Sequence, residues 1–513
     1  MRGHSANAQE LELKLTGSST FGRYPKISSA KTYNMIISDG WLVPYSGYKK
    51  IVEITSAGKG RCCFLSSALE KLIVVIYNTV YLVDTNYNFV KLGTLETTAG
   101  DVFVDENNNS EIAICDKKDI WIYNYEYSTF QKAELDFIPG YVCFQDGYFI
   151  ATVSEAHQWR LSGLNDGLTW TYDTQHVGGF QSKPDVTMAC VRIPGKGSNL
   201  LIFGQKVTEL WVDVGNTLFP YKRTGAFNID YGCLSPATIA SSDTFVAWIG
   251  TNEKSGPALM VSDGGTIKQI TKDGINFKLS QLSYPEKSCG FLFKQDGHLL
   301  YQVSFYKDNF SFVYDFTTDM LFNLTDPDMN YHPVRSLVFF NKSYVFVSLN
   351  DGCLYSLDPS YTDCDGQEIP RIRICESIRF PDSSFFSVPR LTFTLEQGMI
   401  DFPSQQQDMY SILLEDGSPL LQEDGFPLNL ELDTMNQTFV LENPEMPRID
   451  LSMSKDGGES FGNSLGKNLN KKTYRRNRFS YYQLGWGNDF IPQFRFWGFG
   501  RFVISDGTVS VQQ

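Results

Sequence analysis

The sequence lacks the motifs that most enzymes use. It has five histidines, no two of them at the spacing of a metal-ligand pair, and ten cysteines without a CxxC motif, so neither a zinc ribbon nor a thioredoxin motif can be drawn. GxSxG, GxxxxGK[ST] and HExxH are also missing, as is a GxGxxG at a strand-to-helix turn. The sequence therefore carries no signature of a hydrolase, an NTPase, a dehydrogenase or a mononuclear metal enzyme.

Long apolar runs are also missing. No stretch approaches the roughly 18 apolar residues of a membrane span, and the opening MRGHSANAQELELK lacks the apolar core of a secretory signal. We therefore expect no membrane span and no secretion by that route. The scattered cysteines are then expected to be reduced, buried, small apolar residues.

Basic residues are scarce. Lys and Arg number 44 against 58 Asp and Glu, which gives a net charge of −14 and argues against a protein that coats nucleic acid by bulk attraction. One segment, KNLNKKTYRRNRFSYY, concentrates basic side chains among aromatic ones, as a contact with DNA or an acidic partner would. The alternative is a strand whose arginines pair with acidic neighbours. The candidate contact residues are Lys467, Lys471, Lys472, Arg475, Arg476 and Arg478.

Aromatic residues and Asp-Gly dipeptides are abundant. Aromatics reach 14%, and Asp-Gly occurs twelve times, which favours strands joined by tight hairpin turns. Strand pairs recur from about residue 60 to 365, with runs such as LIVVIYNTVYLVD and YVFVSLNDGCLYSLD. Repeats of this kind bury their faces by radial stacking, so residues 61–365 are predicted to form a β-propeller of about seven blades. Residues 1–60 are predicted to close onto the propeller.

Helical patterns are nearly absent. The best candidate, around residues 277–287, is interrupted by Pro285. After about residue 365 the strands become longer, and we expect a C-terminal β-sandwich over residues 366–513. The fold class is therefore all-β.

The region of the predicted sandwich contains a near-duplicated acidic sequence. LLEDGSPL is followed at once by LQEDGFPL, within a stretch of about 405–445 that is predicted to form an inserted loop or β-arm. Such an arm serves either as a contact for a neighbouring subunit or as a tolerated surface insertion. The sequence leaves both interpretations open.

SKDGGESF is close to the Asp-box of sialidases and other propellers, and NDGLTW repeats its second half. In that box the Asp fixes a hairpin turn and the aromatic packs under it, so the motif stabilises a fold and performs no chemistry. A carbohydrate-binding or sialidase-like propeller is the alternative function, although no pair of catalytic carboxylates can be identified. A WD-repeat scaffold is a weaker alternative, because the GH…WD spacing is absent.

Several blocks resemble one family. Between residues 166 and 240 these blocks are FG, VTELW, PY followed by an arginine, GA, YGC and SP. Further along the chain they are FVAWIGTNEKSGPALMVSDGGTIKQIT, GHLLYQVSFYKDNFSFVYDFTTDMLFNL and the basic segment ending in LGWG. In this order they are similar to the packaged-DNA stabilisation, or tail-hub, proteins of short-tailed bacteriophages. The similarity extends to the opening TYNMIISDGWLVPYSGYKKI, while the stretch of about 405–445 lies outside it.

The resemblance implies a structural protein of the virion, located in the phage tail. Such proteins form a ring, commonly sixfold, below the portal and its adaptor, where they stabilise packaged DNA and mount a plug or needle. Partners are then further copies of the chain, the adaptor, the needle, tailspike or fibre proteins, and double-stranded DNA held without sequence specificity. The resemblance implies no enzymatic activity, no catalytic residue, no metal and no cofactor.

Overall fold

The computed structural model describes residues 9–24, 30–171, 173, 175–193, 195, 197–216, 219–397, 410–411, 429–430, 448–468, 475–498 and 502–513; for 225–229, 397, 410–411, 429–430 and 475–476 it describes the backbone alone. The described chain is all-β, as predicted, and carries one short helix, α1 (Asp273–Ser280), and one 3₁₀ turn, η1 (Pro236–Thr238). The helix begins and ends earlier than the sequence pattern indicated. No helix within these ranges is long and apolar enough to cross a membrane.

Tight Asp-Gly turns form the hairpins that the sequence predicts. Asp146 and Gly147 have φ values of 50° and 90° and join β14 (Pro139–Gln145) to β15 (Tyr148–Val153). Asp296 and Gly297, at 47° and 86°, join β27 (Ser288–Gln295) to β28 (His298–Phe305). Both residues of each turn need positive φ, which Gly accepts freely and Asp tolerates. In the first of these hairpins the two strands pair up to the turn, with Gln145 opposite Tyr148.

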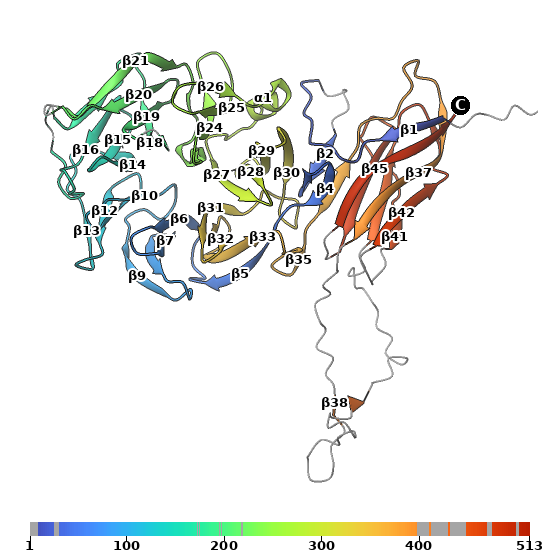
Figure 1. Cartoon of the computed structure of the whole chain (residues 1–513), viewed down its shortest axis with the longest axis horizontal. Coiled ribbons are helices and arrows are strands. Elements are labelled where there is room, and N and C mark those ends of the chain that lie inside the picture. The colour runs from blue at the N-terminus through green and yellow to red at the C-terminus, as the bar shows by residue number, and fades with distance from the viewer. Residues whose placement is uncertain are drawn as a thin grey trace, which may run out of the picture.

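Four-stranded antiparallel sheets follow one another around a ring (Figure 1). In the first four sheets each strand pairs with the next in the chain, so each of these sheets is a local meander. The first four sheets comprise β6 (Gly60–Ser66), β7 (Lys71–Ile76), β8 (Thr79–Val83) and β9 (Phe89–Thr94); β10 (Phe103–Glu106), β11 (Glu111–Cys115), β12 (Ile120–Asn124) and β13 (Thr129–Lys132); β14 (Pro139–Gln145), β15 (Tyr148–Val153), β16 (Gln158–Leu161) and β17 (Val177–Gly179); and β18 (Thr187–Arg192), β19 (Asn199–Gly204), β20 (Thr208–Asp213) and β21 (Tyr221–Ile229).

The later sheets of the ring are less regular. They comprise β22 (Gly232–Cys233), β23 (Ala240–Ser241), β24 (Val246–Thr251), β25 (Ala258–Ser262) and β26 (Ile267–Gln269); β27 (Ser288–Gln295), β28 (His298–Phe305), β29 (Phe310–Asp315) and β30 (Met320–Leu324); and β31 (Val334–Phe340), β32 (Ser343–Ser348) and β33 (Cys353–Asp358) with β5 (Gly47–Glu53), which β34 (Asp363–Cys364) and β35 (Gln367–Glu368) extend.

Strand β5 closes the ring. It precedes β6 in the chain but pairs antiparallel with β33, with Tyr48 opposite Leu357. The last sheet therefore combines one strand from the N-terminal end of the propeller with three from its C-terminal end, so the first and last sheets cannot separate without breaking this ladder.

One sheet of the propeller continues into the C-terminal part of the chain. The outer strand β30 pairs with β2 (Lys31–Tyr33), which pairs with β36 (Arg371–Ile374), and the order continues through β44 (Ile491–Trp497), β40 (Arg448–Ser454) and β41 (Leu465–Asn468). Nine strands thus share one hydrogen-bonded sheet. The propeller is joined to the C-terminal strands by a backbone ladder and not only by a linker.

A seven-stranded sheet lies against this one. Its order is β3 (Met35–Ser38), β4 (Trp41–Pro44), β45 (Phe502–Gln512), β37 (Phe386–Gln397) and β42 (Arg475–Tyr482), with β1 (Gln9–Leu13) on β45 and β43 (Trp486–Gly487) on β37. Phe393 of β37 packs edge-on against Phe494 of β44 at 5.2 Å between ring centroids. The shared core also reaches Leu300 and Phe322 of the propeller.

The N-terminal segment, which the sequence predicts to close onto the propeller, contributes strands to three sheets. Only β5 completes a propeller sheet, whereas β1, β3 and β4 belong to the sheet of β45 and β2 bridges the two regions. The physical reason is that the long strand β45 offers a ladder edge, on which Gln9–Leu13 pairs residue by residue. Most of the predicted arm at 405–445 lies outside the described residues; within it, β38 (Tyr410–Ser411) pairs with β39 (Asn429–Leu430).

Candidate functional site

Two adjoining cavities occupy the axis of the propeller. The first, of about 310 Å³, is lined by residues of the inner strands β6, β10, β14, β23, β27 and β31. The second, of about 590 Å³, is lined by residues of β6, β10, β14, β18 and β23. Phe64, Val104 and Tyr141 line both. Among all their lining residues Asp105 is the sole carboxylate, so neither cavity offers the pair of carboxylates that glycoside hydrolysis requires.

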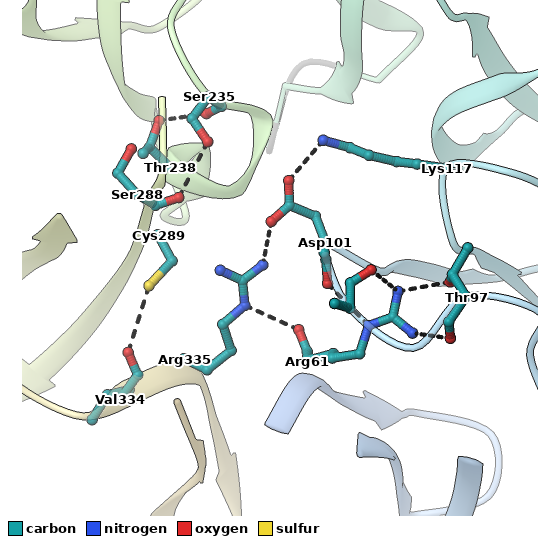
Figure 2. A network of polar contacts seen from close by, with 12 residues as sticks. Arg61, Thr97, Asp101, Lys117, Ser235, Thr238, Ser288, Cys289, Val334 and Arg335 are labelled. Carbon is teal, nitrogen blue, oxygen red and sulfur yellow. Dashed lines mark hydrogen bonds and ion pairs between the residues drawn. The ribbon is translucent and has the colours of Figure 1, made fainter. Parts of the chain in front are cut away.

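A polar network lies at the start of the inner strands (Figure 2). Arg335, at the start of β31, reaches Asp101 with an N–O distance of 2.5 Å and donates to the Arg61 carbonyl at 3.1 Å. Lys117 contacts the other oxygen of Asp101 at 2.7 Å. The Arg61 guanidinium donates to the carbonyls of Tyr77, Thr97, Ala99 and Gly100 and to the Thr97 hydroxyl.

The electrostatics of this network favour its charged form. Burial alone would raise the pKa of Asp101, but Arg335 and Lys117 outweigh it and hold the pKa well below its usual range. Burial lowers the pKa of Arg61, whose guanidinium donates to carbonyl oxygens. The network ties the last sheet to the first and the second. Its cations are occupied by protein acceptors, so it stabilises the closed ring and does not form an anion site.

Ser38, His298 and Asp315 are arranged in the order of a hydrolase triad. Nδ1 of His298 lies 2.8 Å from Asp315, and Nε2 lies 3.0 Å from the Ser38 hydroxyl. Asp315 also accepts from the Thr317 amide and the Thr318 hydroxyl, which fixes the turn after β29. None of the three lines either axial cavity. We assign the group as a structural clamp between β28 and β3, because its hydrogen bonds join Ser38 to His298.

The Asp-box forms a turn whose aspartate is occupied by hydrogen bonds within the box. Asp456 accepts hydrogen bonds from the Ser454 hydroxyl at 2.6 Å and from the Ser460 amide at 3.0 Å, and these bonds lower its pKa. The related sequence NDGLTW also forms a turn, in which the Trp170 indole donates to the Gly167 carbonyl at 2.8 Å. In the described part of the chain, no cluster of three or more His, Cys, Asp or Glu side chains is placed to hold a metal ion.

The basic segment borders both C-terminal sheets. Lys467 lies on β41, the last strand of the nine-stranded sheet, and Arg478 lies on β42, the last strand of the seven-stranded sheet. The Lys467 ammonium sits 5.2 Å from the centroid of the Tyr481 ring, and the Arg478 side chain is exposed. Neither forms an ion pair with a described carboxylate. Arg475 and Arg476 lie on β42, while Lys471 and Lys472 lie outside the described residues.

The structure also brings together residues that sequence reasoning missed. Arg61, Asp101 and Arg335 are separated by up to 274 positions, and no short-range pattern connects them. The same holds for Cys143 and Cys190, whose sulfur atoms lie 3.2 Å apart beside the second cavity. The adjacent Cys62 and Cys63, in contrast, alternate across β6 into different core clusters.

Comparisons with known proteins give one clear match. The family model described as "Bacteriophage P22 Gp10, beta-propeller" matches residues 21–361, which is more than half of the 513-residue chain. No curated protein matches the sequence.

Solved structures show only distant similarity. The extracellular domain of a one component system from B. thetaiotaomicron is 12% identical with a TM-score of 0.41, over 61% of this chain and 40% of that one, so the chain spans less than half its length. Streptogramin B lyase is 10% identical with a TM-score of 0.42, over 63% and 99%. Virginiamycin B lyase from Staphylococcus aureus with quinupristin is 9% identical with a TM-score of 0.42, over 61% and 99%.

Proposed function

Because the chain belongs to the bacteriophage P22 Gp10 β-propeller family, whose members are phage stabilisation proteins of the virion tail, we propose that it forms a ring below the portal and its adaptor. There it closes the head after packaging, stabilises the packaged DNA and mounts the distal plug or needle. The family match over residues 21–361 carries this proposal. In the same proposal it acts without catalysis and without a cofactor.

The propeller has seven blades in this proposal, formed by residues 61–365, and the C-terminal residues 366–513 form a sandwich. The order of the sheets from β6 to β33, with β5 completing the last one, supports the blade count. The edge-on contact between Phe393 of one sheet and Phe494 of the other supports the sandwich. The continuous ladder through β2 would keep the two parts in fixed orientation, as a ring under pressure from packed DNA requires.

An exposed aromatic cluster supports assembly into a ring. Phe385 and Trp486 stack with ring centroids 6.5 Å apart, and both remain more than half exposed, at 56% and 55%. Tyr482, at 61% exposure, lies at the same end of the seven-stranded sheet. Large aromatic side chains left in water are typical of surfaces that a partner covers. We assign this cluster to the contact between neighbouring copies.

Charge supports a passage for DNA. A subunit with a net charge of −14 repels the phosphate backbone and lets it slide, since every neutralised phosphate would add affinity. The basic segment is the exception, and we propose that it contacts an acidic partner surface or the DNA itself. The adaptor, the needle and the tailspike or fibre proteins are the remaining partners of the proposal.

Electron cryomicroscopy of virions tests the position. Density of this fold in a ring below the portal, and heads that lose DNase-protected DNA when the gene carries a nonsense codon, are the expected results. Virions that lack the protein yet retain their DNA would contradict the proposal. A soluble protein that never copurifies with virions would contradict it as well.

Mutation of the aromatic cluster tests the ring contact. The double variant Phe385→Ser, Trp486→Ser is expected to sediment as a monomer where the parent forms rings. Tyr127→Ser is the matched control, because Tyr127 is equally aromatic and 71% exposed but lies on a propeller turn. If both variants form rings as the parent does, the assignment of the contact is wrong.

A further inference from the structure

Two cysteines from neighbouring propeller sheets meet in the core. Cys143 of β14 donates its S–H to the sulfur of Cys190 of β18 at 3.2 Å, and Cys190 donates to the Ile150 carbonyl at 3.3 Å. Both belong to the apolar cluster that fills the space between these two sheets, together with Trp159 and Trp211. The hydrogen bonds hold the two sulfur atoms side by side.

The pair is accessible to small molecules on one side. Cys143 and Cys190 both line the second axial cavity of about 590 Å³. Cys143 is 5% exposed and Cys190 is fully buried. A small reagent that enters the axis therefore meets Cys143 first, and Cys190 is placed to react second. Burial raises the pKa of Cys190 well above its usual value, so reaction is expected to be slow at neutral pH.

From this geometry we infer that Cys143 and Cys190 form a modification site: a small disulfide oxidises them to an inter-sheet disulfide that staples β14 to β18. The thiolate of Cys143 attacks one sulfur of the reagent, forms a mixed disulfide and releases one thiol. The sulfur of Cys190, after losing its proton to water, displaces the second thiol. Two protein thiols and one small disulfide thus give one protein disulfide and two small thiols.

The arrangement differs from that of the other cysteines. All ten are buried and reduced in the structure. The sulfur atoms need to approach from 3.2 Å to about 2.05 Å to form the bond. The link joins residues 47 positions apart in two sheets of the ring. A virion protein folds in a reducing cytoplasm and then leaves it, so the staple would form after release and resist later unfolding.

Peptide mapping tests the site in the full-length protein. The protein is incubated with bis(2-hydroxyethyl) disulfide at pH 8, digested without reductant and examined by mass spectrometry. The expected product is a peptide pair joining Cys143 to Cys190, lighter than the two thiol peptides by two hydrogen atoms. The melting temperature is expected to rise by about 5 °C.

The variants separate this result from general oxidation. Cys143→Ala and Cys190→Ala are expected to lose the linked peptide and the rise in melting temperature, whereas Cys375→Ala, at a buried cysteine of a different core cluster, keeps both. Two free thiols at 143 and 190 after oxidation of the folded parent would overturn the inference, as would links to other cysteines in equal yield. Because the map is read on the parent protein, a variant that fails to fold does not affect the test. Ring assembly is not measured, so the outcome is independent of the proposed position in the tail.

Discussion

Asn34 and Thr325 exchange two hydrogen bonds at the junction between the propeller and the C-terminal sheets. The Asn34 amide nitrogen donates to the Thr325 hydroxyl at 2.8 Å, and its side-chain oxygen accepts from the Thr325 backbone amide at 2.9 Å. The same side chain donates to the Pro370 carbonyl, just before β36. Asn34 is buried and has a φ of 55°, a conformation that Asn tolerates better than most residues. One side chain therefore ties three segments of the chain.

Replacing Asn34 is expected to destabilise the fold at this junction. Asn34→Gly keeps the left-handed backbone but removes all three side-chain bonds, and we expect a loss of about 2–4 kcal/mol in the free energy of unfolding. Asn34→Ala should lose about 1 kcal/mol more, because Ala is strained at this φ. Asp39→Gly is the control, since Asp39 also has positive φ but is exposed. The free energies of unfolding of all three variants are measured in urea. Equal stability of Asn34→Gly and the parent would refute the stabilising role of the Asn34 side chain.

The hairpins of the propeller could be predicted because their signals are local. Asp-Gly turns and short apolar runs can be recognised within a window of about ten residues. The structure has the hairpins β14–β15 and β27–β28 at two of these Asp-Gly positions. The inward orientation of Arg371 and Arg373 could not be predicted, because alternation in RIRI suggests buried isoleucines. Both residues are 1% exposed, and their guanidinium groups donate to backbone carbonyls. That of Arg373 donates to Gly17, Ser18 and Lys14. These partners lie more than 350 positions away in sequence.

The candidate site was predictable only in part for the same reason. The basic segment is a local concentration of charge and is visible in the sequence, and the structure places Lys467 and Arg478 on neighbouring sheet edges. The axial network depends on the closure of the ring, which brings Arg335 to Asp101 across 234 positions. No pattern within a strand encodes that distance.

Breaking the axial ion pair is expected to open the ring closure. Arg335→Met leaves the carboxylate of Asp101 buried without its main partner, so unfolding should become easier by about 3–5 kcal/mol. The double variant Arg335→Met, Asp101→Asn should recover part of that loss, because no uncompensated charge remains. Lys183→Met is the control, since its pair with Asp230 is exposed and contributes about 0–1 kcal/mol. Strictly additive losses in the double variant would show that the two groups do not interact.

His332 is expected to make stability depend on acid pH. It is buried, its Nδ1 accepts from the Gln302 amide nitrogen at 3.0 Å, and its ring packs against Tyr45 and Tyr48. Burial lowers its pKa from 6.5 to about 3. The unfolded chain thus binds a proton that the folded chain does not, so stability is full above pH 6.5 and falls by about 1.4 kcal/mol per pH unit as the pH drops towards 3.

The variant His332→Phe isolates that contribution. It keeps an aromatic ring beside Tyr45 and Tyr48 but has no proton to bind, so its unfolding free energy should fall less steeply between pH 6.5 and 3. The quantity compared is the slope and not the absolute stability, because Gln302 loses an acceptor in the variant. Parallel slopes for the two proteins would show that His332 is not the responsible group.

Charge reversal on the basic sheet edges separates a DNA contact from a protein contact. Lys467→Glu with Arg478→Glu changes the net charge by −4, at side chains without a described carboxylate partner, so folding should be unaffected. If the segment meets phosphates, duplex DNA binding by the parent should weaken as salt rises, and the variant should lose about two units of that log–log slope. If it meets an acidic protein surface, DNA binding is unchanged while virions incorporate less of the variant. Glu126→Lys with Glu134→Lys, at two exposed positions of the propeller, is the control of opposite sign. Normal incorporation together with unchanged DNA binding would exclude both contacts.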